Sequence, residues 1–279
     1  MTLRLAISGF GRIGRMVLRA LVESGRDDVE IVLINTPGAV EASAHLYEFD
    51  SIHGRARAAV SHGDGWMDVG RGRIAMTHER DPAAIPHADH GIDVVLECSG
   101  HFNARDKAAL HLAAGARRVL VSAPCKDADA TIVHGVNHAD ITADMEVVSN
   151  ASCTTNCLAP VAKVMADSVG IEAGYMTTIH AYTGDQPTLD SNHKDLRRAR
   201  AAALSMIPTS TGAARSVGDV LPQLKGRMNG SAIRVPTANV SVVDFGFTSK
   251  RDTSTDEINS LLRAAAEGPM KGILGVNDR

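Results

Sequence analysis

A cysteine with the surroundings of a nucleophile lies near the middle of this 279-residue chain. Cys153 follows the small polar run 149–152 and precedes the apolar stretch 158–165, which is compatible with a helix. At a helix start, unpaired backbone N–H groups and the positive end of the helix dipole both favour a thiolate over a neutral thiol. Because most cysteines are small buried hydrophobes, position makes Cys153 a candidate nucleophile that needs support from the rest of the chain.

The other cysteines predict neither disulfides nor a metal centre. Cys98, Cys125 and Cys157 have no spacing that demands a disulfide, which fits a reducing compartment. Cys153 and Cys157 would lie one helical turn apart, a spacing open to a metal or redox pair but more often found for packed neighbours. We therefore expect no metal site.

Three glycines near the N-terminus predict a phosphate-binding turn. Gly9, Gly11 and Gly14 form a G-x-G-x-x-G pattern between the apolar run 3–7 and a helical pattern over 16–21. Such glycines permit a tight turn, close approach of backbone to a pyrophosphate and packing of helix on sheet, while the helix N-terminus faces the phosphates. Glycines of an ordinary loop are the alternative, so the prediction depends on context.

That context is an alternation of strands and helices, which changes near residue 150. Strands are predicted over 30–35, 92–96 and 118–122, with a helix over 107–114, as repeated parallel β-α units require. Later come extended segments over 174–182, 232–235 and 239–247.

A polar, cationic segment over 183–203 lies among these extended segments, and its part 197–203 predicts an exposed helix. We therefore predict the α/β class: a Rossmann-type doubly wound sheet in a dinucleotide-binding domain, residues 1–150, and an α+β catalytic domain, residues 151–279.

Composition fits a soluble enzyme. Hydrophobic residues make up 44% of the chain, which is ordinary for a globular protein, and the net charge is −3. That charge disfavours nucleic acid or a membrane surface as the main partner. With no signal peptide and no apolar run of about 18 residues, we expect a cytoplasmic protein.

Four longer motifs together resemble those of phosphorylating glyceraldehyde-3-phosphate dehydrogenase. They are SNASCTTNCLAP at 149–160, TIHAYT at 178–183, STGAA at 210–214 and RVPTANVSVVD at 234–244. The resemblance runs from residue 2 to residue 279. It implies a homotetramer that oxidises glyceraldehyde 3-phosphate to 1,3-bisphosphoglycerate, with a nicotinamide cofactor and inorganic phosphate.

The resemblance also implies roles for individual residues. Cys153 is the nucleophile, and His180, singled out from 12 histidines only by its flanking motif, lowers the thiol pKa and handles the proton. Thr183 and Arg234 would bind the substrate phosphate. Ser152, Thr154, Thr211 and Gly212 would bind the attacking phosphate, and Arg198 would help to hold phosphate. The expected cofactor contacts are Gly9, Gly11, Arg12, Ile13, Gly14, Asn35, Thr36, Arg80, Ser99 and Ser122.

The residue after the second strand departs from the NAD-selective pattern. Rossmann strands normally end in an acidic residue about 20 residues after the glycines, which accepts hydrogen bonds from the ribose and repels a 2′-phosphate. Thr36 stands there instead, and Ser191 with Asn192 resembles the NADP-using photosynthetic members. We expect NADP or dual use. The alternative is that Asn35 handles the ribose and NAD is the cofactor, since no arginine is obviously supplied for the extra phosphate.

The C-terminal end is a second departure. The family pattern continues past residue 279 through further strands, an asparagine that holds the nicotinamide carboxamide and a C-terminal helix. If the chain were the whole protein, apolar surface would be uncovered and activity would be doubtful. If it were a fragment, the enzyme interpretation would stand.

Two other functions remain open from the sequence. Erythrose-4-phosphate dehydrogenase shares the fold, the cysteine and the histidine, although the STGAA motif favours the glyceraldehyde-3-phosphate enzyme. A truncated, non-catalytic nucleotide-binding or assembly protein would bind cofactor without turnover.

Overall fold

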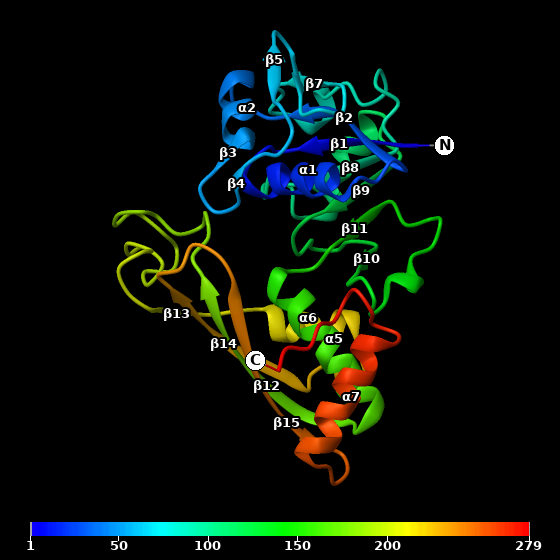
Figure 1. The fold of residues 1–279 in the computed structure, drawn as a ribbon, viewed down its shortest axis with the longest axis vertical. Helices are drawn as coiled ribbons and strands as arrows, with labels where there is room; N and C mark the ends of the chain where they lie inside the picture. Colours follow the sequence, from blue (N-terminus) through cyan, green and yellow to red (C-terminus); the bar gives the residue numbers. More distant parts are fainter. Residues whose placement is uncertain (1, 279) are drawn as a thin grey trace. The chain divides into compact units, whose positions relative to one another are not determined.

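The computed structural model describes residues 2–278, which form two compact units. The first contains the chain up to Thr131 together with 141–150, and the second contains 132–140 and the chain from Ala151 onward. Figure 1 shows the elements of each unit. Residues 132–140 therefore belong to the second unit, although they come before residue 150 in the sequence.

The first unit is built on a nine-stranded sheet in the order β10-β11-β9-β8-β1-β2-β7-β6-β5. Its strands are β1 (Leu3–Ser8), β2 (Val29–Asn35), β5 (Ser61–Gly63), β6 (Trp66–Asp68), β7 (Arg73–Thr77), β8 (Val94–Glu97), β9 (Arg118–Val121), β10 (Ala130–Thr131) and β11 (Val147–Ser149). All neighbours pair in parallel except β5–β6 and β6–β7. The strand order reverses between β1 and β8, the position at which doubly wound sheets bind ligands. The predicted α/β, Rossmann-type class is confirmed.

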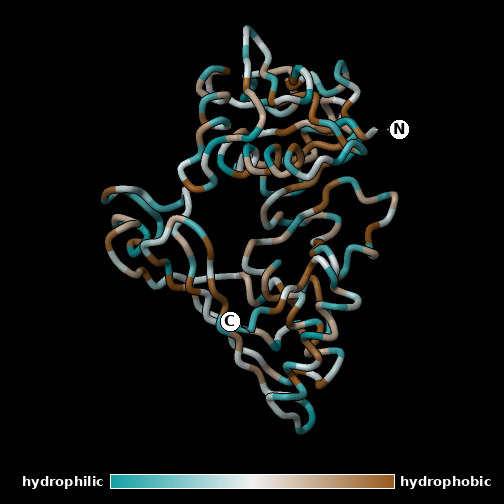
Figure 2. The backbone as a smooth tube through the Cα atoms, in the orientation of Figure 1, coloured by the Kyte–Doolittle hydropathy of each residue, from teal (hydrophilic) through white to brown (hydrophobic). Residues whose placement is uncertain are grey.

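Hydrophobic residues cover both faces of this sheet. Along β1, Leu5 and Ile7 belong to one core cluster and Ala6 to another, because side chains alternate between the two faces. The helices are α1 (Arg12–Ser24), α2 (Val40–Glu48), α3 (Arg105–Ala108) and α4 (Leu110–Ala113), and a small ladder joins β3 (Phe49–Asp50) to β4 (Gly54–Arg55). Figure 2 shows apolar residues along the central strands of the unit. The helix expected over 107–114 is two short helices that meet at Ala109.

The second unit packs helices on a four-stranded mixed sheet, in the order β13-β14-β12-β15. Its strands are β12 (Ile171–Ala181), β13 (Ile207–Thr209), β14 (Met228–Val235) and β15 (Ser241–Ser249), and its helices are α5 (Cys153–Ser168), α6 (Ala213–Val220) and α7 (Thr255–Glu267). The helices gather on one face of the sheet (Figure 1). Leu158, Met165, Met176 and Val217 are buried in the core between them. The three extended segments predicted here correspond to β12, β14 and β15.

The predicted exposed helix over 197–203 is wrong, because this segment consists of turns and bends. Two of its backbone N–H groups donate to residues outside the segment: Ala201 N–H to Asp190 Oδ1 and Ala202 N–H to the Pro187 carbonyl. Ala201 and Ala202 are consequently buried. An alanine and arginine composition favours a helix locally, but these long-range hydrogen bonds satisfy the backbone in another way.

Candidate active site

The thiol of Cys153 lies at the first position of α5. Ser152 is the N-cap residue, and its hydroxyl accepts a hydrogen bond from Thr155 N–H at 3.0 Å. Ala151 turns the chain into the helix in the left-handed conformation, with φ of 57°, which is uncommon for a residue other than glycine. Cys153 is exposed. Its position at the start of α5 is the one that the sequence predicted.

His180 reaches the thiol from the end of β12. Its Nε2 lies 3.2 Å from Cys153 Sγ. In the parallel register of β12 and β14, His180 lies directly opposite Arg234, and Arg234 Nη1 lies 2.6 Å from His180 Nδ1. The sheet thus brings together three of the predicted site residues, 27 and 54 positions apart in the chain.

The thiol and the imidazole change each other's pKa values. The hydrogen bond with His180 lowers the pKa of Cys153 from 9.0 to about 7, against the opposing effect of burial. The same bond raises the pKa of His180, against burial and the charge of Arg234. A pKa near neutrality makes the thiolate far more abundant at pH 7 than the ordinary value of 9.0 does. The pair is therefore poised to hold a nucleophile at neutral pH.

The Nδ1 atom of His180 has a partner in either protonation state. The Ala181 carbonyl oxygen lies 2.7 Å away and can accept from Nδ1–H of the imidazolium. Arg234 Nη1 can instead donate to an unprotonated Nδ1, and it also donates to the Ala181 carbonyl at 2.9 Å. When Nδ1 keeps its proton and donates it to the Ala181 carbonyl, Nε2 can release and take up a proton, as a general acid and base must.

The other cysteines lack this activation. Burial raises the pKa of Cys98 to about 11, and burial also raises the pKa values of Cys125 and Cys157. Cys157 is exposed on the same helix as Cys153 but lacks an imidazole partner that would offset this effect. The four thiols are thus distinguished by their neighbours.

Two guanidinium groups lie on the His180 side of the site. Burial lowers the pKa of Arg234, and the nearby charge of Arg198 lowers it further. Arg198 donates to Asp185 Oδ2 at 2.9 Å and to the Ser210 carbonyl at 3.1 Å, which holds it next to Thr211. Thr183 is exposed just after β12. Guanidinium and hydroxyl groups are the donors that bind anions in proteins.

A second group of predicted phosphate ligands lies where α5 and α6 begin. Gly212 is the N-cap residue of α6, without a side-chain cap, and a Cβ on it would meet open space. Thr211 Oγ1 accepts from Ala213 N–H at 3.1 Å, and Thr155 Oγ1 donates to the Ala213 carbonyl at 3.4 Å. The two helix starts, carrying Ser152, Thr154, Thr211 and Gly212, are therefore tied together.

The predicted nucleotide turn in the first unit fits a pyrophosphate. Gly9 has φ of +89°, and a Cβ on it would lie 2.4 Å from Ser99 Cα, so only glycine fits. A Cβ on Gly14 would lie 2.3 Å from the Gly9 carbonyl oxygen. Gly11 caps α1 without a side chain and borders open space. The start of α1 thus borders open space at Gly11, as a phosphate-binding turn requires.

The other predicted cofactor residues lie at the carboxyl ends of the parallel strands. Asn35 is the last residue of β2 and Thr36 comes directly after it. Ser99 follows β8, and Ser122 follows β9. The side-chain amide of Asn35 is committed to protein partners, since it donates to the Glu79 carbonyl and accepts from Glu79 N–H and Thr77 Oγ1, each at 2.9 Å. This favours a structural role for Asn35 over sole recognition of a ribose.

Three further predicted residues surround the glycine turn and the end of β7. Arg12 begins α1 and donates to Asp50 Oδ2 at 2.9 Å. Ile13 is 52% exposed beside it, and Arg80 is exposed after β7.

The sequence did not predict the two acidic residues that form ion pairs with Arg198 and Arg12. Asp185 accepts from Arg198, and buried Asp50 accepts from Arg12. Although burial opposes it, hydrogen bonds from Arg12, His53 and Ile52 hold the pKa of Asp50 far below its usual range. In the sequence, Asp185 could have been found as a partner for Arg198 because it lies in the same cationic segment, 183–203.

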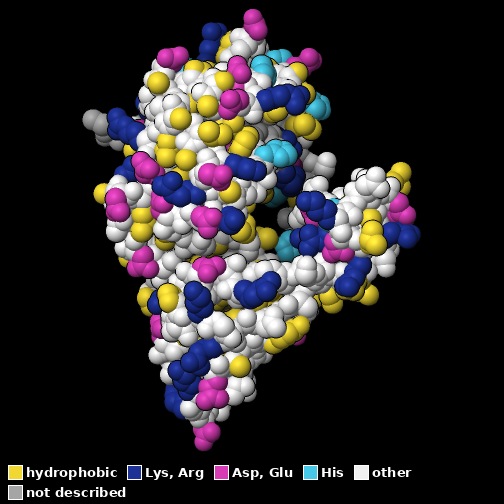
Figure 3. All heavy atoms as spheres, turned by 180° about the vertical axis from the view of Figure 1, so that it is seen from behind, with side chains coloured by type: hydrophobic (Ala, Val, Ile, Leu, Met, Phe, Trp, Pro, Cys, Tyr) yellow, Lys and Arg dark blue, Asp and Glu magenta, His cyan; other side chains and the backbone are white. Residues whose placement is uncertain are grey.

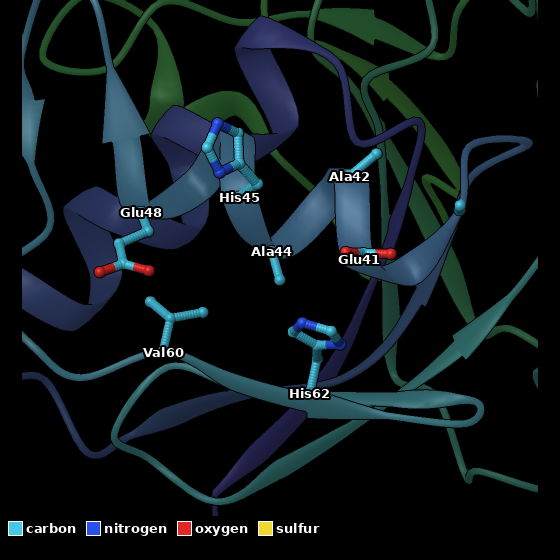
Figure 4. A pocket seen from close by; sticks show the side chains of 8 residues that line it. Glu41, Ala42, Ala44, His45, Glu48, Val60 and His62 are labelled. Carbon is cyan, nitrogen blue, oxygen red and sulfur yellow. The ribbon is translucent and has the colours of Figure 1, made fainter.

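Other features of the described residues add no competing site. A hollow of about 450 Å³ between α2 and the β5 region is lined by Glu41, His45, Glu48 and His62, among others, and none of the predicted site residues lines it (Figure 4). Within residues 2–278, no three His, Cys, Asp or Glu side chains are grouped to hold a metal ion. No described helix is both long and apolar enough to span a bilayer. Acidic and basic side chains are interspersed over the face in Figure 3.

A Rossmann-type unit and a cysteine–histidine pair beside two arginines are features of a cofactor-dependent oxidoreductase. Comparison with protein families identifies one family for both units. Residues 3–105 match the glyceraldehyde 3-phosphate dehydrogenase NAD binding domain, and residues 152–279 match the C-terminal domain of the same family. The chain belongs to the glyceraldehyde-3-phosphate dehydrogenase family.

Curated relatives agree over the full length of the chain. It is 66% identical to glyceraldehyde-3-phosphate dehydrogenase of Cereibacter sphaeroides over 99% of this chain and 82% of the relative. It is 63% identical to that of Xanthobacter flavus and 50% identical to that of Geobacillus stearothermophilus, in each case over 100% of this chain and 83% of the relative.

Proposed function

We propose that this chain catalyses the oxidative phosphorylation of glyceraldehyde 3-phosphate to 1,3-bisphosphoglycerate with a nicotinamide cofactor. The observation that carries the proposal is the 3.2 Å contact between Cys153 Sγ and His180 Nε2, beside Arg234. Family membership supplies the reaction class.

The chemistry begins with addition of the Cys153 thiolate to the aldehyde carbon. A C–S bond forms, the carbonyl electron pair moves to oxygen, and His180 Nε2–H donates to that oxygen, which gives a thiohemiacetal. A bound nicotinamide ring would accept the hydride that leaves the thiohemiacetal carbon. As that C–H bond breaks, His180 takes the hydroxyl proton and the C=O bond re-forms, which leaves a thioester on Cys153.

The thioester is opened by an oxygen of inorganic phosphate. The new C–O bond forms, the C–S bond breaks, and the thiolate returns to its contact with His180. Arg234, Arg198 and Thr183 would bind the phosphate of the substrate, and Ser152, Thr154, Thr211 and Gly212 would bind the attacking phosphate. Their hydroxyl, guanidinium and backbone donors match the two anions that this reaction requires.

The direct test is a steady-state assay of reduced cofactor formation with glyceraldehyde 3-phosphate and with erythrose 4-phosphate, each with and without inorganic phosphate. The proposal expects faster turnover of the first aldehyde and dependence on phosphate. A preference for erythrose 4-phosphate without phosphate dependence would favour the related dehydrogenase. Cofactor binding without turnover of either aldehyde would identify a non-catalytic protein.

Arg234→Leu is expected to raise KM for glyceraldehyde 3-phosphate by about 10- to 100-fold, because a charge-assisted hydrogen bond to an anion contributes roughly 1.5–3 kcal/mol. Steady-state kinetics over a range of aldehyde concentrations measures this change. Arg227→Leu, at an exposed residue just before β14, is the matched control. An unchanged KM in Arg234→Leu would remove this residue from the substrate site.

The cofactor itself is proposed to be NADP, or NADP and NAD alike. The support is the threonine at position 36, which presents no negative charge to a 2′-phosphate, together with the prior commitment of the Asn35 amide to Glu79 and Thr77.

Thr36→Asp should therefore weaken NADP binding by at least about tenfold and leave NAD binding unchanged or tighter, because a carboxylate repels the extra phosphate. Titration calorimetry with each dinucleotide measures both affinities. Ser61→Asp, which adds the same charge at an exposed position of β5, should change neither. Equal loss of both dinucleotides in Thr36→Asp would contradict a role in selectivity.

A homotetramer is proposed as the assembly. The segment 189–206 exposes large apolar side chains that a partner could cover: Leu189 is 76% exposed, Leu196 80%, Leu204 81% and Met206 68%. Sedimentation velocity gives the oligomeric state directly.

A further inference from the structure

Glu97, the last residue of β8, carries a carboxylate that is withdrawn from solvent. The residue is 1% exposed, and the catalytic steps above make no use of it. A buried charge is costly unless it is paired and hydrogen-bonded. Its partners therefore show what the burial accomplishes.

One oxygen of this carboxylate holds the turn that carries Ser99. Glu97 Oε1 accepts from Ser99 N–H at 2.7 Å and from the Ser99 hydroxyl, and Ser99 Oγ in turn accepts from His101 N–H at 3.1 Å. The same turn lies against Gly9, where an added Cβ would be 2.4 Å from Ser99 Cα. The carboxylate thus fixes Ser99 against the phosphate-binding glycine turn.

The other oxygen is held by a chain of two buried histidines. His111 Nε2 lies 3.0 Å from Glu97 Oε2, and His111 Nδ1 lies 3.0 Å from His87 Nε2. Both rings are 0% exposed. Burial raises the pKa of Glu97, but hydrogen bonds from His111, Ser99 and Ser8 more than offset it, so the pKa lies below its ordinary value. With both oxygens engaged, the ionised carboxylate has one orientation.

We infer that Glu97, oriented by His111, is a positioning residue for the nucleotide site, which sets cofactor affinity by fixing the Ser99 turn against Gly9. The inference rests on the proposed function, in which the glycine turn and Ser99 bind the nicotinamide dinucleotide. It adds to that function a residue that contacts neither cofactor nor substrate but acts through Ser99.

The test compares the near-isosteric Glu97→Leu with wild type. Leucine cannot accept from Ser99, so the dissociation constants of NAD and NADP, measured by titration calorimetry without substrate, should rise by at least about tenfold. In steady state, KM for the cofactor should rise while kcat changes by less than about threefold. The rate of Cys153 alkylation by iodoacetamide should not change, because this thiol belongs to the other unit.

Three further variants separate positioning from general stability. Glu97→Gln keeps an oxygen that can accept from Ser99, so it should restore binding to within about threefold of wild type. His111→Phe removes the donor to Oε2 and should weaken binding by at least about threefold, which tests the inference even if Glu97→Leu fails to fold. Val119→Ala makes a cavity in the core of the same unit, where Val119 is 1% exposed, and should lower the melting temperature without changing cofactor affinity.

Wild-type affinity in both Glu97→Leu and His111→Phe would overturn the inference and leave the proposed function intact. Equal weakening in Val119→Ala would overturn it too, since affinity would then follow stability alone. A wild-type chain that binds neither dinucleotide would overturn the proposed function and this inference with it.

Discussion

Replacing Cys153 by serine is expected to lower kcat by at least about 10⁴-fold while leaving dinucleotide affinity unchanged. A serine hydroxyl cannot be ionised by the His180 contact near neutral pH, so it cannot add to the aldehyde as the thiolate does. Steady-state assay of reduced cofactor formation measures the loss, and titration calorimetry measures the retained affinity. Mass spectrometry of wild type after rapid quenching should detect the acyl group on Cys153.

Cys157 provides the matched control for this experiment. It is exposed on α5, one helical turn from Cys153, and burial raises its pKa. Cys157→Ser should keep kcat within about twofold of wild type. Substantial turnover in Cys153→Ser would end the covalent mechanism, and loss of turnover in Cys157→Ser alone would transfer the role to the second thiol.

Replacing His180 by asparagine is expected to lower kcat at pH 7 by roughly 10³- to 10⁴-fold. The thiol pKa should rise from about 7 toward 9.0, which reduces the thiolate fraction at pH 7 by about 50-fold. Loss of proton transfer to and from the hemiacetal oxygen contributes a further factor of about 10². The pH dependence of Cys153 alkylation by iodoacetamide measures the first effect, as an upward shift of its midpoint.

The two contributions separate at high pH. Well above pH 9 the thiol is ionised in both proteins, so the alkylation rates should converge, while a kcat deficit of about 10² should remain because the imidazole that accepts the hydroxyl proton is still missing. His134→Asn, at an exposed residue of the same unit, should reproduce the wild-type profile. An alkylation midpoint in His180→Asn that stays near 7 would show that the helix start, rather than the imidazole, ionises the thiol.

Local features of the sequence predicted much of the fold. The polar residues before Cys153 end in Ser152, whose hydroxyl caps the helix, so this helix start depends on interactions within a few residues. Gly14 likewise follows from a close contact within its own turn, with the Gly9 carbonyl oxygen, whereas Gly9 is required by its contact with Ser99, which is distant in the sequence. The exposed helix predicted over 197–203 failed because Asp190 and Pro187, outside the segment, bind its N–H groups.

The sequence by itself determined which residue types stand at a helix start, at a glycine turn and at strand ends, because caps, turns and periodicity are set by neighbours along the chain. Only the tertiary structure decided that His180 lies opposite Arg234 across two strands and 3.2 Å from Cys153 Sγ. It likewise decided that Glu97 meets His111 away from solvent. Sheet register and burial join residues far apart in the chain, and these contacts, rather than residue type, set the pKa values and orientations on which the chemistry depends.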